Sequence, residues 1–146
     1  MRKKKTSLFL CIAILICGIG KAGNQNVSII NLKTEMHSSP VGLDMQNPNL
    51  SWEITSPKKN VIQKYYRIIV APSLNTLSAK SGKLCWDSGI VKSDRQNYVA
   101  YNGQPLQSGT SYYWKVCVMT NKGTAWSQPA KWQTGLMNSS EWKAKW

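Results

Sequence analysis

The chain has 146 residues, a formal net charge of +13 and 42% hydrophobic residues. This length suits one domain with a single hydrophobic core and leaves little room for a second. Beyond the N-terminus the lysines and arginines are scattered, with no run longer than Lys58-Lys59, whereas nucleic-acid-binding proteins usually gather such charge on one face. The charge therefore indicates a solvated basic surface, and we expect no nucleic-acid partner.

The first 22 residues have the pattern of a signal peptide. A basic stretch at residues 2–5 precedes residues 8–19, which carry no charged side chain and are too few to span a bilayer. Small residues then offer cleavage after Gly20 or Ala22, and we favour Ala22. Cleavage there leaves 124 residues, removes five positive charges and lowers the formal net charge from +13 to +8. We expect an exported protein that is periplasmic, outer-membrane-associated or extracellular.

The cysteines divide between this segment and the mature chain. Cys17 could carry a lipid, but the bulky Ile16 before it argues against processing there, so membrane attachment is expected only if Cys17 is lipidated. Cys85 and Cys117 lack the spacing of a metal site, and a domain of this size can build a core without a disulfide. We expect two thiols that are free or weakly buried.

After the signal, short runs of alternating apolar residues recur between Gly, Pro, Asn and Ser clusters, a pattern typical of a sandwich or barrel. The stretch 72–82 is long enough for a loop or one helical turn, and Pro129 is tolerated in the last strand only at an edge or bulge. Seven strands suit an all-β fibronectin type III or immunoglobulin-like sandwich. They are predicted at residues 27–32, 50–54, 64–71, 90–92, 97–101, 112–120 and 125–134.

Aromatic residues supply both the predicted core and the candidate surface. Those placed in or beside the core are Trp52, Tyr66, Trp86, Tyr112 and Trp114. Those least claimed by the core are Tyr65, Tyr113, Trp126 and Trp132. The second group could stack on sugar rings or dock against a neighbouring domain, and we favour docking because protein interfaces are enriched in Trp and Tyr.

Residues for catalysis or metal binding are sparse. A glycoside hydrolase needs two carboxyl groups that flank the bond, and no pair among the acidic residues of the mature chain is placed to share a cleft. His37, the single histidine, lies in a predicted loop without a nucleophile nearby in sequence. We expect no catalytic residue, no metal and no cofactor. The acidic residues are Glu35, Asp44, Glu53, Asp87, Asp94 and Glu141.

Residues 106–112 have the form of a tyrosine corner, in which the Tyr112 hydroxyl bonds an upstream backbone group. This feature and Trp52 on an early strand resemble a fibronectin type III domain. Five ordered motifs are more specific: Asn47-Pro48-Asn49-Leu50-Ser51-Trp52, Tyr66-Arg67-Ile68-Ile69-Val70-Ala71, Trp86-Asp87-Ser88-Gly89, Pro105-Leu106-Gln107-Ser108-Gly109 and Tyr112-Tyr113-Trp114-Lys115-Val116. In this order they resemble the N-terminal domain of bacterial α-L-rhamnosidases of glycoside hydrolase family 78.

The resemblance implies a division into a signal peptide at 1–22, a sandwich at 23–135 and a linker toward a further domain at 136–146. It also implies that the parent hydrolyses terminal α-L-rhamnose with carboxylates of a downstream (α/α) barrel, none of which lies in this sequence. We therefore expect a non-catalytic structural module, as a truncated chain or fragment, whose partners are the downstream domains in cis. The alternative is a stand-alone module for carbohydrate binding or cell-surface adhesion, with rhamnose-containing glycans as partners.

Overall fold

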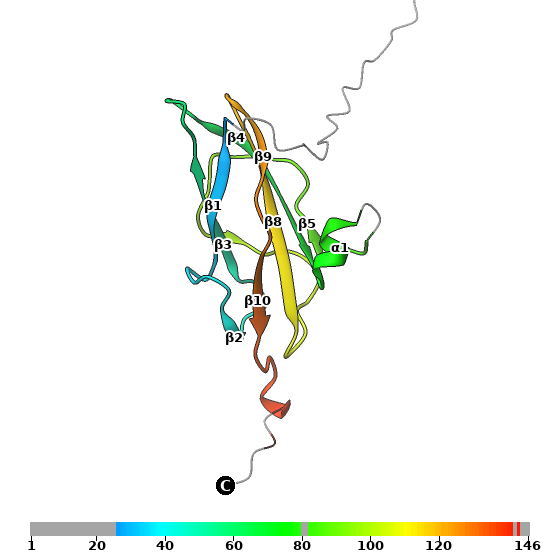
Figure 1. The fold of residues 1–146 in the computed structure, drawn as a ribbon. Helices are drawn as coiled ribbons and strands as arrows, with labels where there is room; N and C mark the ends of the chain where they lie inside the picture. Colours follow the sequence, from blue (N-terminus) through cyan, green and yellow to red (C-terminus); the bar gives the residue numbers. More distant parts are fainter. Residues whose placement is uncertain (1–25, 80–81, 142, 144–146) are drawn as a thin grey trace, which may run out of the picture.

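The computed structural model describes residues 26–79, 82–141 and 143, so the expected signal peptide and Cys17 lie outside the described residues. Within them, the chain forms a β-sandwich with one short helix and one short 3₁₀ turn (Figure 1). The elements are β1 (Ser28–Thr34), β2 (Val41–Leu43), β3 (Asn49–Thr55), β4 (Gln63–Ala71), α1 (Leu74–Ser78), β5 (Trp86–Asp87), β6 (Val91–Lys92), β7 (Val99–Ala100), β8 (Ser111–Thr120), β9 (Gly123–Trp126), β10 (Ala130–Thr134) and η1 (Ser139–Glu141).

Two sheets form the layers of the sandwich. One sheet has the order β1-β3-β7; the other has the order β2-β10-β8-β4-β5, with β6 also paired to β4 and β9 to β8. The pairs are antiparallel except for β2 and β10, which run parallel. The predicted all-β, immunoglobulin-like fold is confirmed. The seven predicted strands become ten because the last one divides near Pro129, and because β2 and β5 form outside the predicted strand ranges.

The core lies between the two sheets and follows the alternation of β8. Tyr112, Trp114, Val116 and Val118 point inward, and Trp114 is 0% exposed. Trp52 on β3 is 1% exposed and packs edge-to-face on Tyr66, with ring centroids 5.3 Å apart. Of the five aromatic residues predicted for the core, four are buried; the fifth, Trp86, is half-buried and packs against the same cluster.

The loop before β8 forms the expected tyrosine corner. The backbone N–H of Gln107 donates to the Tyr112 hydroxyl at 2.8 Å. Leu106 beside it is buried, and Gly109 has a φ of +63°, in the left-handed region that glycine enters without a steric penalty. This hydrogen bond fixes the loop between β7 and β8 to the beginning of β8, the longest strand.

A second, smaller cluster lies on the outer face of the larger sheet. Leu77 of α1 packs on Ile69 and Ala71 of β4, so this face is partly covered. The helix begins at Ser73, whose hydroxyl accepts a hydrogen bond from the Thr76 N–H at 3.1 Å. Among the described residues, no helix has the length and apolar character needed to cross a membrane.

Candidate docking surface

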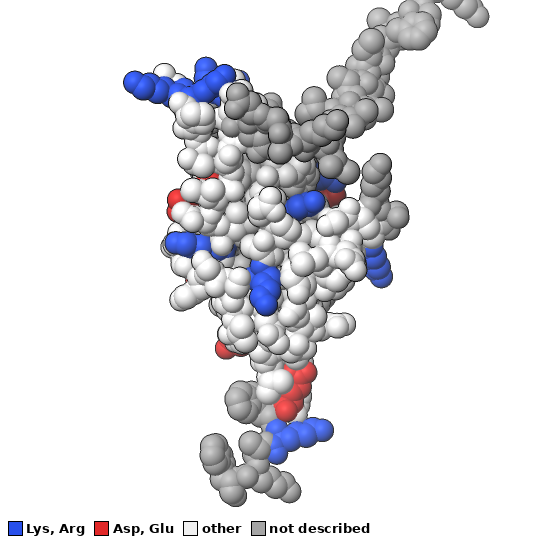
Figure 2. All heavy atoms as spheres, viewed as in Figure 1, with Lys and Arg blue, Asp and Glu red and all other residues white. Residues whose placement is uncertain are grey.

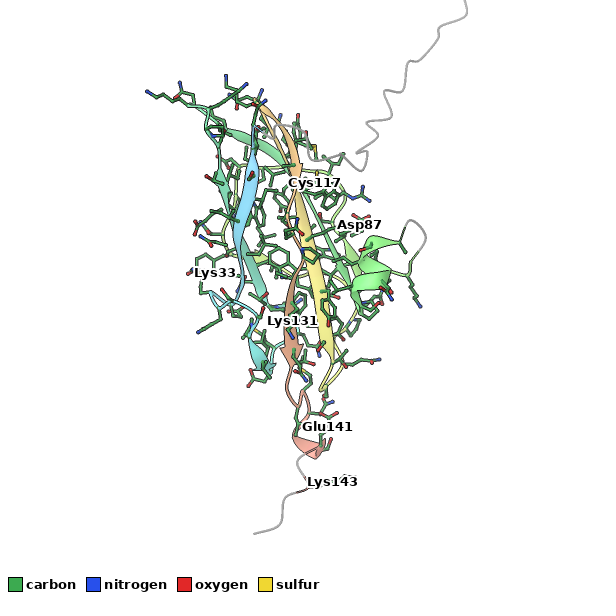
Figure 3. The ribbon with its side chains drawn as sticks, viewed as in Figure 1. Lys33, Asp87, Cys117, Lys131, Glu141 and Lys143 are labelled. Atoms are coloured by element: carbon green, nitrogen blue, oxygen red, sulfur yellow. The ribbon has the colours of Figure 1, made fainter. Side chains whose placement is uncertain are left out.

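Four of the six carboxylates among the described residues are engaged in hydrogen bonds within the sandwich. Glu35 accepts a hydrogen bond from the Asn49 side chain at 3.0 Å, and Glu53 accepts one from Asn31 at 2.9 Å. Asp87 belongs to β5, and Figure 3 shows it far from Glu141, which lies at the end of the sandwich below β10. This arrangement does not supply the two facing carboxyl groups of a glycosidase.

Two of these carboxyls have a shifted pKa, and both shifts are downward. A hydrogen bond from Arg67, together with one from the Gly89 N–H, lowers the pKa of Asp87 although burial opposes it. Hydrogen bonds from Ser108 and from the Asn138 backbone lower the pKa of Glu141. A general acid needs the opposite shift, because it must hold its proton near neutral pH.

The remaining reactive side chains do not form a site either. His37 is exposed, with Nδ1 2.6 Å from the backbone oxygen of Glu35. Cys85 and Cys117 are not joined by a disulfide, in agreement with the prediction of two thiols, and burial raises the pKa of Cys85. Within the described residues, no three His, Cys, Asp or Glu side chains are grouped closely enough to hold a metal ion.

Three of the four predicted surface aromatics share the outer face of the larger sheet. Tyr65 on β4, Tyr113 on β8 and Trp126 on β9 are all half-buried. The register sets Trp126 opposite Cys117 and Tyr65 opposite Met119, which are outward positions of β8. This outer aromatic surface, defined by Tyr65, Tyr113 and Trp126, is the candidate for docking or sugar stacking.

Basic side chains partly cover this surface. The Lys115 ammonium lies 5.0 Å from the centroid of the Trp126 ring, in a cation–π contact. Arg67 on the same face forms a two-point hydrogen-bonded ion pair with Asp87, with nitrogen–oxygen distances of 2.9 and 2.5 Å. One side of the Trp126 ring therefore already has a partner, which disfavours an open stacking platform for a sugar.

Trp132 does not belong to the outer aromatic surface, and this prediction was wrong. Its side chain is 0% exposed and stacks on Tyr112 in the core, with ring centroids 5.5 Å apart. Regular continuation from the Trp126–Cys117 pair would set residue 129 opposite Trp114, but Ala130 occupies that place. One extra residue between β9 and β10 thus reverses which side chains face inward, so Trp126 points out and Trp132 points in.

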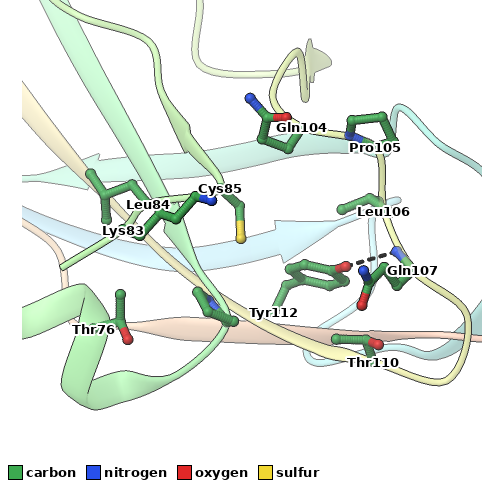
Figure 4. A pocket seen from close by; sticks show the side chains of 11 residues that line it. Thr76, Lys83, Leu84, Cys85, Gln104, Pro105, Leu106, Gln107, Thr110 and Tyr112 are labelled. Atoms are coloured by element: carbon green, nitrogen blue, oxygen red, sulfur yellow. Dashed lines mark hydrogen bonds between the residues drawn. The ribbon is translucent and has the colours of Figure 1, made fainter.

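A hollow of about 720 Å³ lies between α1 and the loop before β8 (Figure 4). Thr76, Lys83 and Leu84 line one side, and Gln107 and Tyr112 line the other. The dashed line in Figure 4 is the hydrogen bond of the tyrosine corner. No residue described in its lining has a carboxylate, so the hollow lacks the groups for glycoside hydrolysis.

Charged side chains are spread over the face of the molecule that Figure 2 shows. Figure 2 shows lysine and arginine side chains over much of the visible face, with a group at the end that carries the β3–β4 loop. Lys58 and Lys59 of that loop are exposed.

One contact at the end of β10 was missed by sequence reasoning. The Ser108 hydroxyl donates to Glu141 at 2.6 Å, across 33 positions of sequence. No local pattern links a loop serine to a carboxylate so far along the chain. Only the sandwich brings the two residues together.

Comparison with known proteins decides the family. Residues 29–138 match the family model described as "Rha78A-like, N-terminal immunoglobulin domain". The chain belongs to this family. The resemblance inferred from the five ordered motifs is thereby confirmed, and this Rha78A-like immunoglobulin domain is a non-catalytic module.

Relatives of this Rha78A-like domain are much longer proteins. An α-L-rhamnosidase of Streptomyces avermitilis is 44% identical over 109 residues, which are 73% of this chain and 10% of that protein. One of Formosa agariphila is 37% identical over 112 residues, 75% of this chain and 12% of that protein. The solved α-L-rhamnosidase of Dictyoglumus thermophilum has a TM-score of 0.76 at 37% identity, over 82% of this chain and 13% of that one.

Proposed function

We propose that this chain is the structural N-terminal module of an α-L-rhamnosidase whose other domains hydrolyse terminal α-L-rhamnose. The observation that carries the proposal is the match of most of the described sandwich to curated proteins named α-L-rhamnosidase, at up to 44% identity. The chain spans only 10% and 12% of those two relatives, which leaves room in a parent for a separate catalytic domain. Four of the six carboxylates form hydrogen bonds within the described sandwich, which supports a structural role for this module.

An activity assay tests the proposal that other domains of the parent, and not this chain, hydrolyse α-L-rhamnosides. The purified 146-residue chain is expected not to hydrolyse an aryl α-L-rhamnoside, because no facing acid and base are assembled in the described sandwich. The Streptomyces avermitilis α-L-rhamnosidase serves as the positive control. Turnover by the chain that a Glu141→Gln or Asp87→Asn variant loses would contradict the proposal.

The DNA that follows the codon for Trp146 gives a second test. The downstream DNA is expected to encode the remainder of an α-L-rhamnosidase. This remainder is expected either in the same reading frame or beyond a stop codon or frameshift. An unrelated downstream sequence would refute the proposed parent while leaving the domain family unchanged.

The outer aromatic surface supports contact with other domains of that parent. Trp126 is half-buried and already carries Lys115 on its ring, an arrangement suited to a protein interface. Titration of the chain with L-rhamnose, followed by tryptophan fluorescence, is expected to give no saturable change. A saturable change that Tyr113→Ala or Trp126→Ala removes would favour sugar binding instead, and Tyr98→Ala, which alters an exposed tyrosine elsewhere, is the matched control.

Export is a further part of the proposal, supported by the basic residues 2–5 and the uncharged residues 8–19. Expression in a Gram-negative host is expected to yield a periplasmic chain that begins at Gly23. Mass spectrometry of the product distinguishes this from a chain lipidated at Cys17, for which a Cys17→Ser variant is the control. An uncleaved cytoplasmic product would contradict export.

A further inference from the structure

The residues that follow β10 are hydrogen-bonded to the sandwich. We call residues 135–141 the exit segment. The Gly109 N–H donates to the Gly135 carbonyl at 3.0 Å, and the Gly135 N–H donates to the Leu43 carbonyl at 2.7 Å. A side chain at Gly135 would bring its Cβ to 3.0 Å from the Gly42 carbonyl oxygen, so the small residue permits this close approach. The segment therefore starts between β2 and the loop before β8.

Hydrogen bonds to Glu141 then close the exit segment onto that loop. One oxygen of Glu141 accepts from the Ser108 hydroxyl at 2.6 Å and from the backbone N–H groups of Met137 and Asn138, each at 3.2 Å. The Ser108 hydroxyl oxygen also accepts from the Met137 N–H at 2.9 Å. We call these four residues the exit lock. Hydrogen bonds to an ionised carboxylate are among the stronger ones in proteins.

Two apolar side chains, one on β2 and one in the exit segment, are exposed in the part of the chain that the structure describes. Val41 of β2 is 72% exposed, and Leu136 of the exit segment is 40% exposed. β2 pairs with β10 directly before the exit segment begins. The exit segment contains Gly135, Ser139 and Ser140, residue types that are common in flexible linkers, but the Met137 N–H bonds it to the sandwich through Ser108.

We propose that the exit lock is a rigid junction, which holds the beginning of the next domain of the parent in one orientation relative to the sandwich. This inference rests on the proposed function, because the matched family is an N-terminal domain, which a further domain of the proposed parent would follow. The partner is that following domain. The exposed Val41 and Leu136 lie where it would cover them.

Backbone ¹⁵N relaxation on the 146-residue chain at pH 7 tests the lock. The amides of residues 136–141 are expected to have order parameters near those of β10, about 0.85. Ser108→Ala removes one donor and one acceptor. The order parameters of the same amides are therefore expected to fall below about 0.6. Glu141→Gln keeps the shape of the side chain but removes its charge, and an intermediate fall is expected.

Matched controls separate loss of the lock from loss of the fold. Ser78→Ala changes an exposed serine on α1 and is expected to leave residues 136–141 unchanged. The β10 amides should stay rigid in every variant, which shows that the sandwich is intact. Order parameters below about 0.6 at residues 136–141 of the unaltered chain, or no change in Ser108→Ala, would overturn the inference. An unrelated downstream reading frame would refute the parent without changing these values, so the two failures are distinguishable.

Discussion

Two tryptophans of nearly equal burial differ in what their indole N–H groups meet. Trp52 donates to the Gln63 side-chain oxygen at 3.2 Å, and the Gln63 amide donates to the Ser93 and Arg95 carbonyls at 3.0 and 2.9 Å. The indole nitrogen of Trp114 is buried without a hydrogen-bond partner among the described residues. Burial alone therefore does not set the cost of replacing either side chain.

Replacement by phenylalanine tests this difference. Trp52→Phe leaves the Gln63 oxygen unsatisfied in the core, whereas Trp114→Phe removes a donor that had no partner. We expect Trp52→Phe to lower the free energy of unfolding by about 1 to 3 kcal/mol more than Trp114→Phe does. Urea denaturation of both variants measures the difference. Equal losses would show that packing, not the Gln63 network, decides the stability at both positions.

The tyrosine corner gives a second comparison between neighbouring residues. Tyr112→Phe removes the oxygen that accepts from the Gln107 N–H at 2.8 Å. We expect a loss of about 1 kcal/mol in the free energy of unfolding, since the freed amide lies next to solvent. Tyr113→Phe, on the opposite face of β8, is the control and should cost less. A larger loss in the free energy of unfolding for Tyr113→Phe would show that the outer-face hydroxyl contributes more to stability than the tyrosine corner.

At the scale of elements, a two-residue strand is held by side chains. β5 pairs with β4, and the ion pair between Asp87 and Arg67 reinforces this edge. The Ser88 hydroxyl adds a hydrogen bond from the Ile68 N–H at 2.8 Å. So short a strand offers few backbone contacts of its own, which explains why side chains contribute to its position.

The ion pair predicts a pH dependence of stability. Because the pKa of Asp87 is lowered in the folded state, its contribution is complete above the unfolded pKa of about 3.9 and is lost as the pH falls through the folded value. Both side chains are about a third exposed, so we expect Asp87→Asn to cost at most about 1 kcal/mol at pH 7 and less at pH 3. Urea denaturation at both pH values measures this, with Asp44→Asn as the exposed control. A cost that does not shrink at pH 3 would contradict the ionic origin.

Across the whole molecule, Val41 and Leu136 are two of several apolar side chains that are left exposed, and Leu136 lies in the exit segment itself. Exposed apolar side chains promote association of isolated domains. We expect the chain to self-associate at high concentration, and Val41→Thr with Leu136→Gln to reduce this in sedimentation velocity. Ile90→Thr removes an apolar side chain of similar exposure away from the exit segment and should have no effect. A monodisperse monomer at high concentration would contradict the prediction.

The sequence by itself determined the fold class, the family and most of the core. The alternation of Tyr112, Trp114, Val116 and Val118 places these side chains on one face whatever lies around them, because successive residues of a strand point to opposite sides. The tyrosine corner was equally local, since Gln107 and Tyr112 are five positions apart. Patterns between residues this close together in the sequence can be recognised from the sequence alone.

The tertiary structure alone decided which way Trp132 faces and what Glu141 does. One unpaired residue between β9 and β10 reverses every later side chain, and the register against β8 reveals where that residue is accommodated. The partner of Glu141 lies 33 positions away in a loop that only the closed sandwich brings beside the exit segment. Pairing register and long-range hydrogen bonds depend on how the sheets assemble, and hydrophobic periodicity carries no information about either.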